Sequence, residues 1–139
     1  MRAAAIDLGT VRVGLAVADE LGMLAHPRPH LDGRDPGRLV DALRRIIEVE
    51  QIEVVLVGHP RQLSGAEGRQ ARKARAFAER LAEACPVRVE LFDERLTTRE
   101  ASARLRAQGL SAREARPRVD SAAAAVMLQA WLDQQDRTR

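Results

Sequence analysis

Three carboxylates stand where predicted strands and helices begin or end. Asp7 interrupts the apolar run AAAIDLGT, Glu94 ends LFDE, and Asp120 opens DSAAAA. Taking an unpaired carboxylate out of water is costly, so a buried strand has no structural use for Asp7. Three converging carboxylates repel one another unless a cation lies between them, and oxygen-only ligands suit Mg²⁺ or Mn²⁺. Because such a cluster stabilises the attacking and leaving oxygens of a phosphodiester displacement, we interpret Asp7 as a metal ligand.

Each acid taken singly also has a structural explanation. An acid at a strand end is often a turn or cap residue, and an Asp that opens a helix is favoured by the helix dipole. Asp7 is the exception, because its neighbours Ile6 and Leu8 offer it no polar partner. If the three acids converge, at least one carboxyl should be harder to ionise than in a free peptide.

The surrounding pattern predicts the elements that must position these acids. Apolar runs predict strands at RAAAIDLG, RVGLAVADE, IEVVLVGHP and VRVELFDE, with the first two joined as a hairpin. HPRPHL holds two prolines, so it is at most a short edge strand. Helical spacing of apolar residues predicts helices over DPGRLVDALRRIIEVEQ, about 68–85, TTREASARLRAQG and about 117–134. This order indicates a mixed sheet with helices on both faces, whose ligands lie outside the carboxyl ends of the strands.

Some details of these elements are expectations about single residues. Thr97 and Glu100 have capping-box spacing at the start of the third helix, and Gly109 is the expected stop of that helix. In VRVELFDE, Val87, Val89 and Leu91 alternate with Arg88, Glu90 and Phe92. Phe92 is therefore expected on the same face of the strand as the two charged residues. Cys85 and Trp131 are expected in the core.

Length and composition fit one soluble globular domain. The chain has 139 residues, of which 23 are Lys or Arg and 20 are Asp or Glu. Lys73 is the only lysine, and arginine carries fixed charge in a planar fork that suits phosphate. An Ala- and Arg-rich chain can equally reflect genome composition. One cysteine excludes an internal disulfide and a Cys-based zinc cluster.

Nothing in the sequence predicts a membrane segment. The longest apolar run, residues 122–128, is too short to span a bilayer. The first residues superficially resemble a signal peptide, but Asp7 interrupts the apolar stretch and no cleavage pattern follows. We therefore expect a cytoplasmic protein.

Four motifs in order, AAIDLGTVRVGLAVAD, VVLVGHPRQLSGAEG, LFDERLTT and VDSAAAAVML, resemble the YqgF/RuvX family over essentially the whole chain. The resemblance implies an α/β, RNase H-like fold, a five-stranded mixed β-sheet flanked by α-helices, in a single domain over 1–139. It also implies a divalent-metal nuclease whose acidic residues match Asp7, Glu94 and Asp120. Adjacent side chains of a strand point to opposite faces, so Asp93 should face away.

The same family is associated with processing of the 5′ end of pre-16S rRNA and with Holliday-junction resolution. The implied partner is therefore nucleic acid, precursor rRNA and/or branched DNA, and a homodimer is an open alternative to a monomer. With two Phe, one Trp and no Tyr, binding should depend on phosphate contacts and shape rather than base stacking. The expected phosphate contacts are Arg12, Arg69, Arg72, Lys73, Arg95 and Arg99.

The stretch GHPRQLSGAEG is a candidate substrate loop. Its candidate residues are Gly58, His59, Gly65 and Gly68, since glycines let backbone amides approach phosphate. The family commonly has GLP followed by Asn here, and a Lys or Arg in place of Val11. These departures put substrate contacts in doubt and leave the acids unaffected. His59 is expected to be a solvent-exposed loop histidine, with proton transfer or phosphate contact as the alternative.

Two other functions remain open. DLGT resembles the first phosphate loop of sugar kinases and actin-like ATPases, but those proteins place nucleotide between two such domains, and this chain has one. A non-catalytic nucleic-acid-binding or ribosome-assembly factor is the second alternative. Retention of all three acids argues against it.

Overall fold

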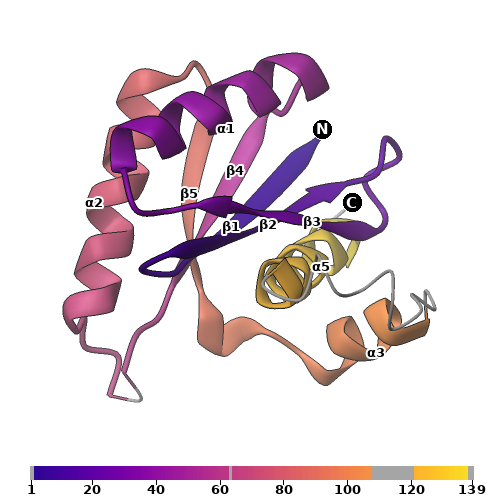
Figure 1. Ribbon diagram of the computed structural model, residues 1–139. Coiled ribbons are helices and arrows are strands. Elements are labelled where there is room, and N and C mark those ends of the chain that lie inside the picture. Colours follow the sequence, from indigo (N-terminus) through magenta and orange to yellow (C-terminus); the bar gives the residue numbers. More distant parts are fainter. Residues whose placement is uncertain (1, 63, 108–120, 138–139) are drawn as a thin grey trace.

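The computed structural model describes residues 2–62, 64–107 and 121–137 and holds five strands, four α-helices and a 3₁₀ turn in this part of the chain (Figure 1). The elements are, in order, β1 Ala3–Leu8, β2 Arg12–Ala18, β3 Ala25–Asp32, α1 Pro36–Glu50, β4 Val54–His59, α2 Arg69–Ala84, β5 Arg88–Asp93, η1 Glu94–Leu96, α3 Arg99–Ala107 and α5 Ala122–Arg137. No described helix is both long and apolar enough to cross a lipid bilayer.

The strands form one mixed sheet in the order β3-β2-β1-β4-β5. β1, β2 and β3 are antiparallel neighbours, whereas β1, β4 and β5 run parallel. The carboxyl ends of the three parallel strands therefore meet at one end of the sheet. Ile6 pairs with Val57 in this register, and His59 pairs with Asp93. The predicted hairpin and the five-stranded mixed sheet flanked by helices are confirmed.

Helices cover both faces of the sheet (Figure 1). α1 and α2 pack on one face, where alternate residues of the strands join the apolar stripes of both helices in one core. α5 packs on the other face together with α3, in a second core that includes Trp131. Asp35 caps α1 by accepting from Gly37 N at 2.9 Å, and Pro36 occupies the first turn. Cys85 is buried at the end of α2, as expected.

Four local expectations are corrected. β3 is an edge strand as predicted but extends over eight residues, because an edge position tolerates the missing N–H groups of its prolines. Thr98 rather than Thr97 caps α3, since its Oγ1 accepts from Ala101 N at 3.0 Å. Phe92 is buried in the second core, because β5 is covered on both faces near its end. α5 continues to Arg137, and its expected start, like Gly109, lies outside the described residues.

Two buried polar side chains attach α5 to the antiparallel half of the sheet. Ser121 Oγ accepts from Leu15 N at 2.9 Å and donates to Arg28 O at 2.5 Å, at a register shift between β2 and β3. Gln129 Oε1 accepts from Ala25 N at 3.0 Å, and its amide nitrogen donates to Met23 O at 3.0 Å. These bonds satisfy backbone groups of β2, of β3 and of the turn between them, and they fix the helix along the sheet.

Candidate active site

Asp7 and Glu94 meet at the carboxyl ends of the parallel strands. Asp7 lies near the end of β1, and Glu94 is the first residue of the 3₁₀ turn that follows β5. Both side chains are half-buried, and they are hydrogen-bonded to each other. Two residues that are 87 positions apart in the sequence thus form one carboxyl pair at the end of the sheet where the sequence predicted a site.

The ionisation of this pair is strongly perturbed. The pKa of Glu94 is raised to about 7, chiefly by burial and then by the neighbouring Asp7 charge and the hydrogen bond between the two groups. Burial also raises the pKa of Asp7, although the hydrogen bond from Glu94 opposes that effect. The protonated Glu94 carboxyl therefore donates to the Asp7 carboxylate. The raised pKa values of Asp7 and Glu94 agree with the expectation that at least one acid is hard to ionise.

Gly58 makes room for this pair. It lies in the buried strand β4, and a Cβ at this position would come within 2.8 Å of Glu94 Oε1 and 2.9 Å of Met127 Sδ. The absence of a side chain lets Glu94 lie against the sheet between β4 and α5. Gly58 was predicted in a loop but lies in β4, beside the carboxyl pair. Its predicted contact with substrate stays a prediction.

The pair lines an open cavity of about 330 Å³. Its walls come from the β1–β2 turn, the end of β4, the start of α2 and Glu94. They consist of Asp7, Leu8, Gly9, Thr10, Gly58, Pro60, Gln70, Ala74 and Glu94. Thr10 and Gln70 are polar wall residues that were not predicted from the sequence. Thr10 lies in the turn after β1 and Gln70 in the first turn of α2, and these positions could have indicated them.

Asp93 serves a different purpose from its neighbour Glu94. Its carboxylate accepts from Arg95 N at 2.9 Å, which caps the 3₁₀ turn, and from Arg95 Nη2 at 2.6 Å. The hydrogen bonds from Arg95 lower the pKa of Asp93 to about 2. Asp93 therefore holds the turn that presents Glu94, and its engagement with Arg95 agrees with the expectation that it faces away.

Comparison with known proteins shows the family to which this chain belongs. A family model described as RuvX, Holliday junction resolvase, matches residues 1–134. The chain belongs to the RuvX family. A relative from Anaeromyxobacter sp. (strain Fw109-5) is 49% identical over 133 residues, covering 96% of this chain and 97% of its own. Another from Rhodococcus erythropolis (strain PR4 / NBRC 100887) is 45% identical over 142 residues, covering 98% and 80%. Both carry the provisional name pre-16S rRNA nuclease.

A solved structure shares the fold of this RuvX chain. It is Thermus thermophilus RuvC in complex with a Holliday junction substrate, which superimposes with a TM-score of 0.63 and 17% sequence identity. The match covers 99% of this chain and 97% of the RuvC chain. At this identity the likeness establishes the common fold.

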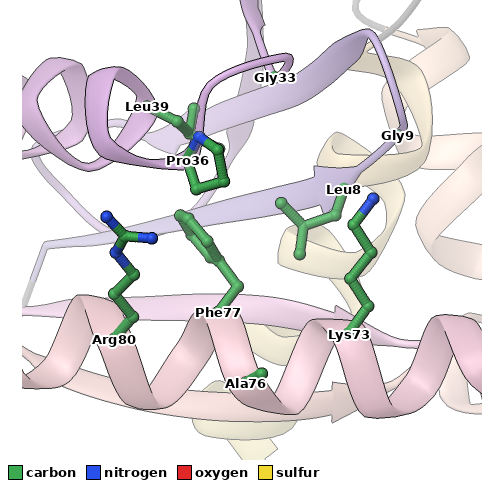
Figure 2. A pocket seen from close by; sticks show the side chains of 9 residues that line it. All are labelled: Leu8, Gly9, Gly33, Pro36, Leu39, Lys73, Ala76, Phe77 and Arg80. Carbon is green, nitrogen blue, oxygen red and sulfur yellow. The ribbon is translucent and has the colours of Figure 1, made fainter.

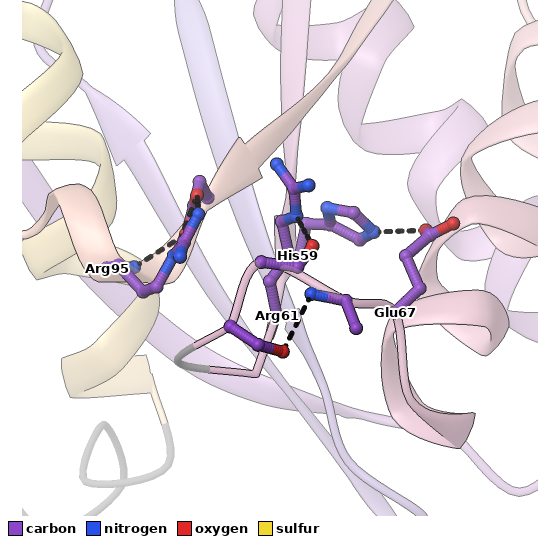
Figure 3. A network of polar contacts seen from close by, with 8 residues as sticks. His59, Arg61, Glu67 and Arg95 are labelled. Atoms are coloured by element: carbon purple, nitrogen blue, oxygen red, sulfur yellow. Dashed lines mark hydrogen bonds and ion pairs between the residues drawn. The ribbon is translucent and has the colours of Figure 1, made fainter.

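His59 departs from the sequence-based expectation. It was expected to be an exposed loop residue, but it ends β4 and is 5% exposed. Its Nε2 lies 2.6 Å from Glu67 Oε2 (Figure 3). Glu67 also accepts from Arg75 Nε at 3.0 Å. The hydrogen bond from Arg75, followed by that from His59, lowers the pKa of Glu67. This pairing could not be predicted from the sequence, because Glu67 lies eight residues from His59 and no motif links the two.

This contact ties the far end of the 60–68 segment of the RuvX chain to the sheet. Within the segment, Gly65 has a φ of +88°, and its carbonyl accepts from Arg61 Nε at 2.9 Å (Figure 3). Gly68 precedes α2 with extended backbone and a negative φ. The positive φ of Gly65 favours glycine at that position, whereas the backbone conformation of Gly68 is one that other residues also adopt. Their predicted contact with substrate stays a prediction.

The six predicted phosphate contacts are all exposed, and they belong to four different elements. They are Arg12, Arg69, Arg72, Lys73, Arg95 and Arg99. The Arg95 guanidinium is engaged by Asp93, and Arg72 Nη1 donates to Glu67 O at 3.2 Å. Val11, where the resemblance to the family led us to expect a basic residue, is 49% exposed beside the β1–β2 turn.

The third predicted ligand, Asp120, lies outside the described residues. Within residues 2–62, 64–107 and 121–137, no three His, Cys, Asp or Glu side chains form a group able to hold a metal ion. The described part of the site is therefore the Asp7–Glu94 pair. Two half-buried carboxyls with raised pKa values supply hard oxygen donors, which fit a magnesium or manganese ion better than a soft metal.

Proposed function

We propose that this RuvX chain is a divalent-metal-dependent nuclease that hydrolyses phosphodiester bonds in structured nucleic acid. The observation that carries the proposal is the carboxyl pair of Asp7 and Glu94, placed together at the open end of three parallel strands. Bringing two acids into contact destabilises a fold, because like charges repel and burial disfavours the charged form of each carboxyl. Such a pair therefore indicates a use other than stability. Cation binding is the use that suits oxygen ligands at a sheet end.

In this proposal, Asp7, Glu94 and Asp120 hold Mg²⁺ or Mn²⁺. The ion, when bound, supplies Lewis-acid stabilisation of the phosphate oxygens and an activated water. Asp120 directly precedes Ser121, whose hydroxyl is fixed between β2 and β3, and this adjacency supports its inclusion. Near neutral pH, Glu94 holds a proton against Asp7, and this proton must leave before both carboxylates can act as ligands.

The substrate we propose is precursor 16S rRNA and/or a Holliday junction. The names of the relatives favour the first, and the family description favours the second. Exposed cations near the site cavity, above all Arg12 and Arg69, support binding through phosphates. We expect affinity to fall steeply between dilute and physiological salt, as counterion release requires. We further propose that the protein acts in the cytoplasm, where bacterial precursor rRNA and chromosomal DNA are found.

The deciding experiment compares cleavage of a four-way DNA junction and of a precursor 16S rRNA fragment with Mg²⁺, with Mn²⁺ and with chelator. Cleavage of either substrate that requires the cation and is lost in Asp7→Asn is the expected result. Salt-sensitive binding without cleavage under every metal condition would instead favour a non-catalytic ribosome-assembly or nucleic-acid-binding factor. Equal cleavage with chelator would overturn the metal-dependent mechanism.

A further inference from the structure

A second cavity lies beside the candidate active site. It has a volume of about 200 Å³ and lies between the β1–β2 turn, the start of α1 and one side of α2. Figure 2 shows Phe77 projecting from α2 toward Pro36, with Leu8 and Lys73 on one side and Arg80 on the other. Nothing in the proposed cleavage chemistry uses this cavity.

The two cavities share a wall. Leu8 and Gly9 line both of them, and both follow directly after Asp7 in the chain. On α2 the walls are also contiguous, because Lys73 lines the second cavity and Ala74 lines the first. The two cavities are therefore adjacent, so that neighbouring parts of one bound strand can reach both.

The lining combines an apolar interior with cations at the edge. Apart from Lys73 and Arg80, every wall residue is apolar or glycine. Both cations are exposed, and within the described part of the chain no carboxylate pairs with either of them. By contrast, Arg75 on the same helix is paired with Glu67. A ligand with a flat apolar body and flanking negative charges matches this arrangement.

We propose that this cavity receives one unstacked nucleobase of the substrate, adjacent to the scissile phosphate, while Lys73 and Arg80 contact the flanking phosphates. The proposal rests on the proposed nuclease function and specifies its substrate class. A cavity of this size is below the range of drug-sized ligand pockets, which suits a single base. Leu8, Pro36 and Phe77 offer the apolar contacts that a base leaving its stack requires.

The substrate class follows from the cost of extruding a base. Unpairing and unstacking cost least where the base is already mismatched or single-stranded. A continuous duplex is therefore a poor substrate, whereas the centre of a four-way junction or a single-stranded precursor end is a good one. Specificity would arise from the state of the strand near Asp7 rather than from hydrogen bonds to base edges.

Two matched variants on α2 test the proposal. Ala76 lines the cavity and Ala82 does not, and both are exposed on the same helix. Ala76→Leu therefore fills the cavity, while Ala82→Leu makes the same change elsewhere. On whichever substrate the parent cleaves, Ala76→Leu should lower kcat/KM about ten-fold, the scale of one lost base-stacking contact, and Ala82→Leu should leave it unchanged.

The position of the base is then read from the fluorescence of 2-aminopurine in complexes with the Asp7→Asn protein. The probe is placed in turn at each of the three nucleotides on either side of the mapped cut. One position should brighten, and the signal should disappear when Ala76→Leu is added but remain with Ala82→Leu. An abasic substrate at that position should be cleaved equally by the parent and by Ala76→Leu.

The outcomes separate the two proposals. If the parent cleaves but no position brightens, or if the two leucine variants cleave equally, the base cavity is overturned and the nuclease function stands. If the parent cleaves neither substrate with either cation, the proposed function fails and the base cavity fails with it.

Discussion

Two groups of carboxylates lie at the same end of the sheet and differ in their partners. Asp93 and Glu67 each face an arginine, and their pKa values are lowered by it. Asp7 and Glu94 face each other, and burial raises the pKa values of both. The first group stabilises the local structure, since Asp93 caps a turn and Glu67 anchors a loop to α2.

The difference separates carboxylates that stabilise local structure from carboxylates that are available to bind a cation. A carboxylate with a guanidinium beside it is already satisfied, and it gains nothing from a metal ion. An ionised carboxyl pair without a cation carries a free-energy cost, which a bound cation removes. Removing a charge should therefore have opposite effects on stability in the two groups, and opposite consequences for activity.

The largest expected effect separates Glu94 from its neighbour. Asp7→Asn and Glu94→Gln should each lower the rate of metal-dependent cleavage by at least about a thousand-fold, because each removes a proposed ligand. Asp93→Asn should lower it less than about ten-fold, since the amide oxygen can still cap the turn. Single-turnover rates on a four-way junction and on precursor rRNA measure all three. A comparable loss in Asp93→Asn would remove the distinction between the groups.

A second change tests the geometry of the pair without touching either acid. Gly58→Ala places a methyl group within 2.8 Å of Glu94 Oε1, so the carboxyl must move. Displacement on this scale should reduce cleavage about 10- to 100-fold, with little change in the melting temperature, because the atoms displaced are the ends of flexible side chains. The control is Gly37→Ala, whose Cβ meets nothing closer than 3.4 Å. Full activity in Gly58→Ala would show that Glu94 does not need its present position.

Mutation of the His59–Glu67 contact should affect stability more than cleavage, the opposite of mutation of the carboxyl pair. His59→Ala removes a buried side chain and its contact with Glu67, so unfolding free energy should fall by about 1–3 kcal/mol. Cleavage should fall less than about ten-fold, since neither residue lines the cavity around Asp7. Urea unfolding, with exposed His26→Ala as the matched control, measures the first effect. A His59→Ala protein of parental stability but without activity would instead place His59 in the chemistry.

The smallest expected effect is the pH dependence of stability without metal. Glu94 has a pKa of about 7 in the folded chain against an ordinary value of 4.5, so the folded state binds more protons between these values. Its destabilising charge therefore appears as pH rises through this window. Glu94→Gln should melt with the parent near pH 4.5 and about 2–4 °C above it at pH 8.

Asp93→Asn should change the melting temperature at neutral pH in the opposite direction to Glu94→Gln. The pKa of Asp93 is lowered to about 2, so its contribution to stability is complete above about pH 4 and is lost as pH falls toward 2. Asp93→Asn should therefore melt below the parent at pH 7, with a difference that shrinks in acid. If both variants shift in the same direction at neutral pH, the comparison between the two groups fails.

Much of this arrangement could be predicted from sequence because it follows from strand direction. Asp7 lies near the end of β1 and Glu94 directly follows β5, and parallel strands place such residues at one sheet end. The anchors could not be found this way. His59 and Glu67 are joined through an irregular loop, and Ser121 looks like one more small residue before four alanines. Thr97 and Thr98 are equally good cap residues, and the path of the preceding 3₁₀ turn selects Thr98.

The central claim is that Asp7 is present for a cation and not for the fold. The direct measurement is the melting temperature of the parent and of Asp7→Asn without substrate, in chelator and in increasing Mg²⁺ or Mn²⁺. In chelator, Asp7→Asn should melt at or above the parent. A cation at ten times its dissociation constant should raise the parent by about 4 °C and Asp7→Asn much less. An Asp7→Asn protein that melts clearly below the parent in chelator, or that gains as much from the cation, would contradict the account.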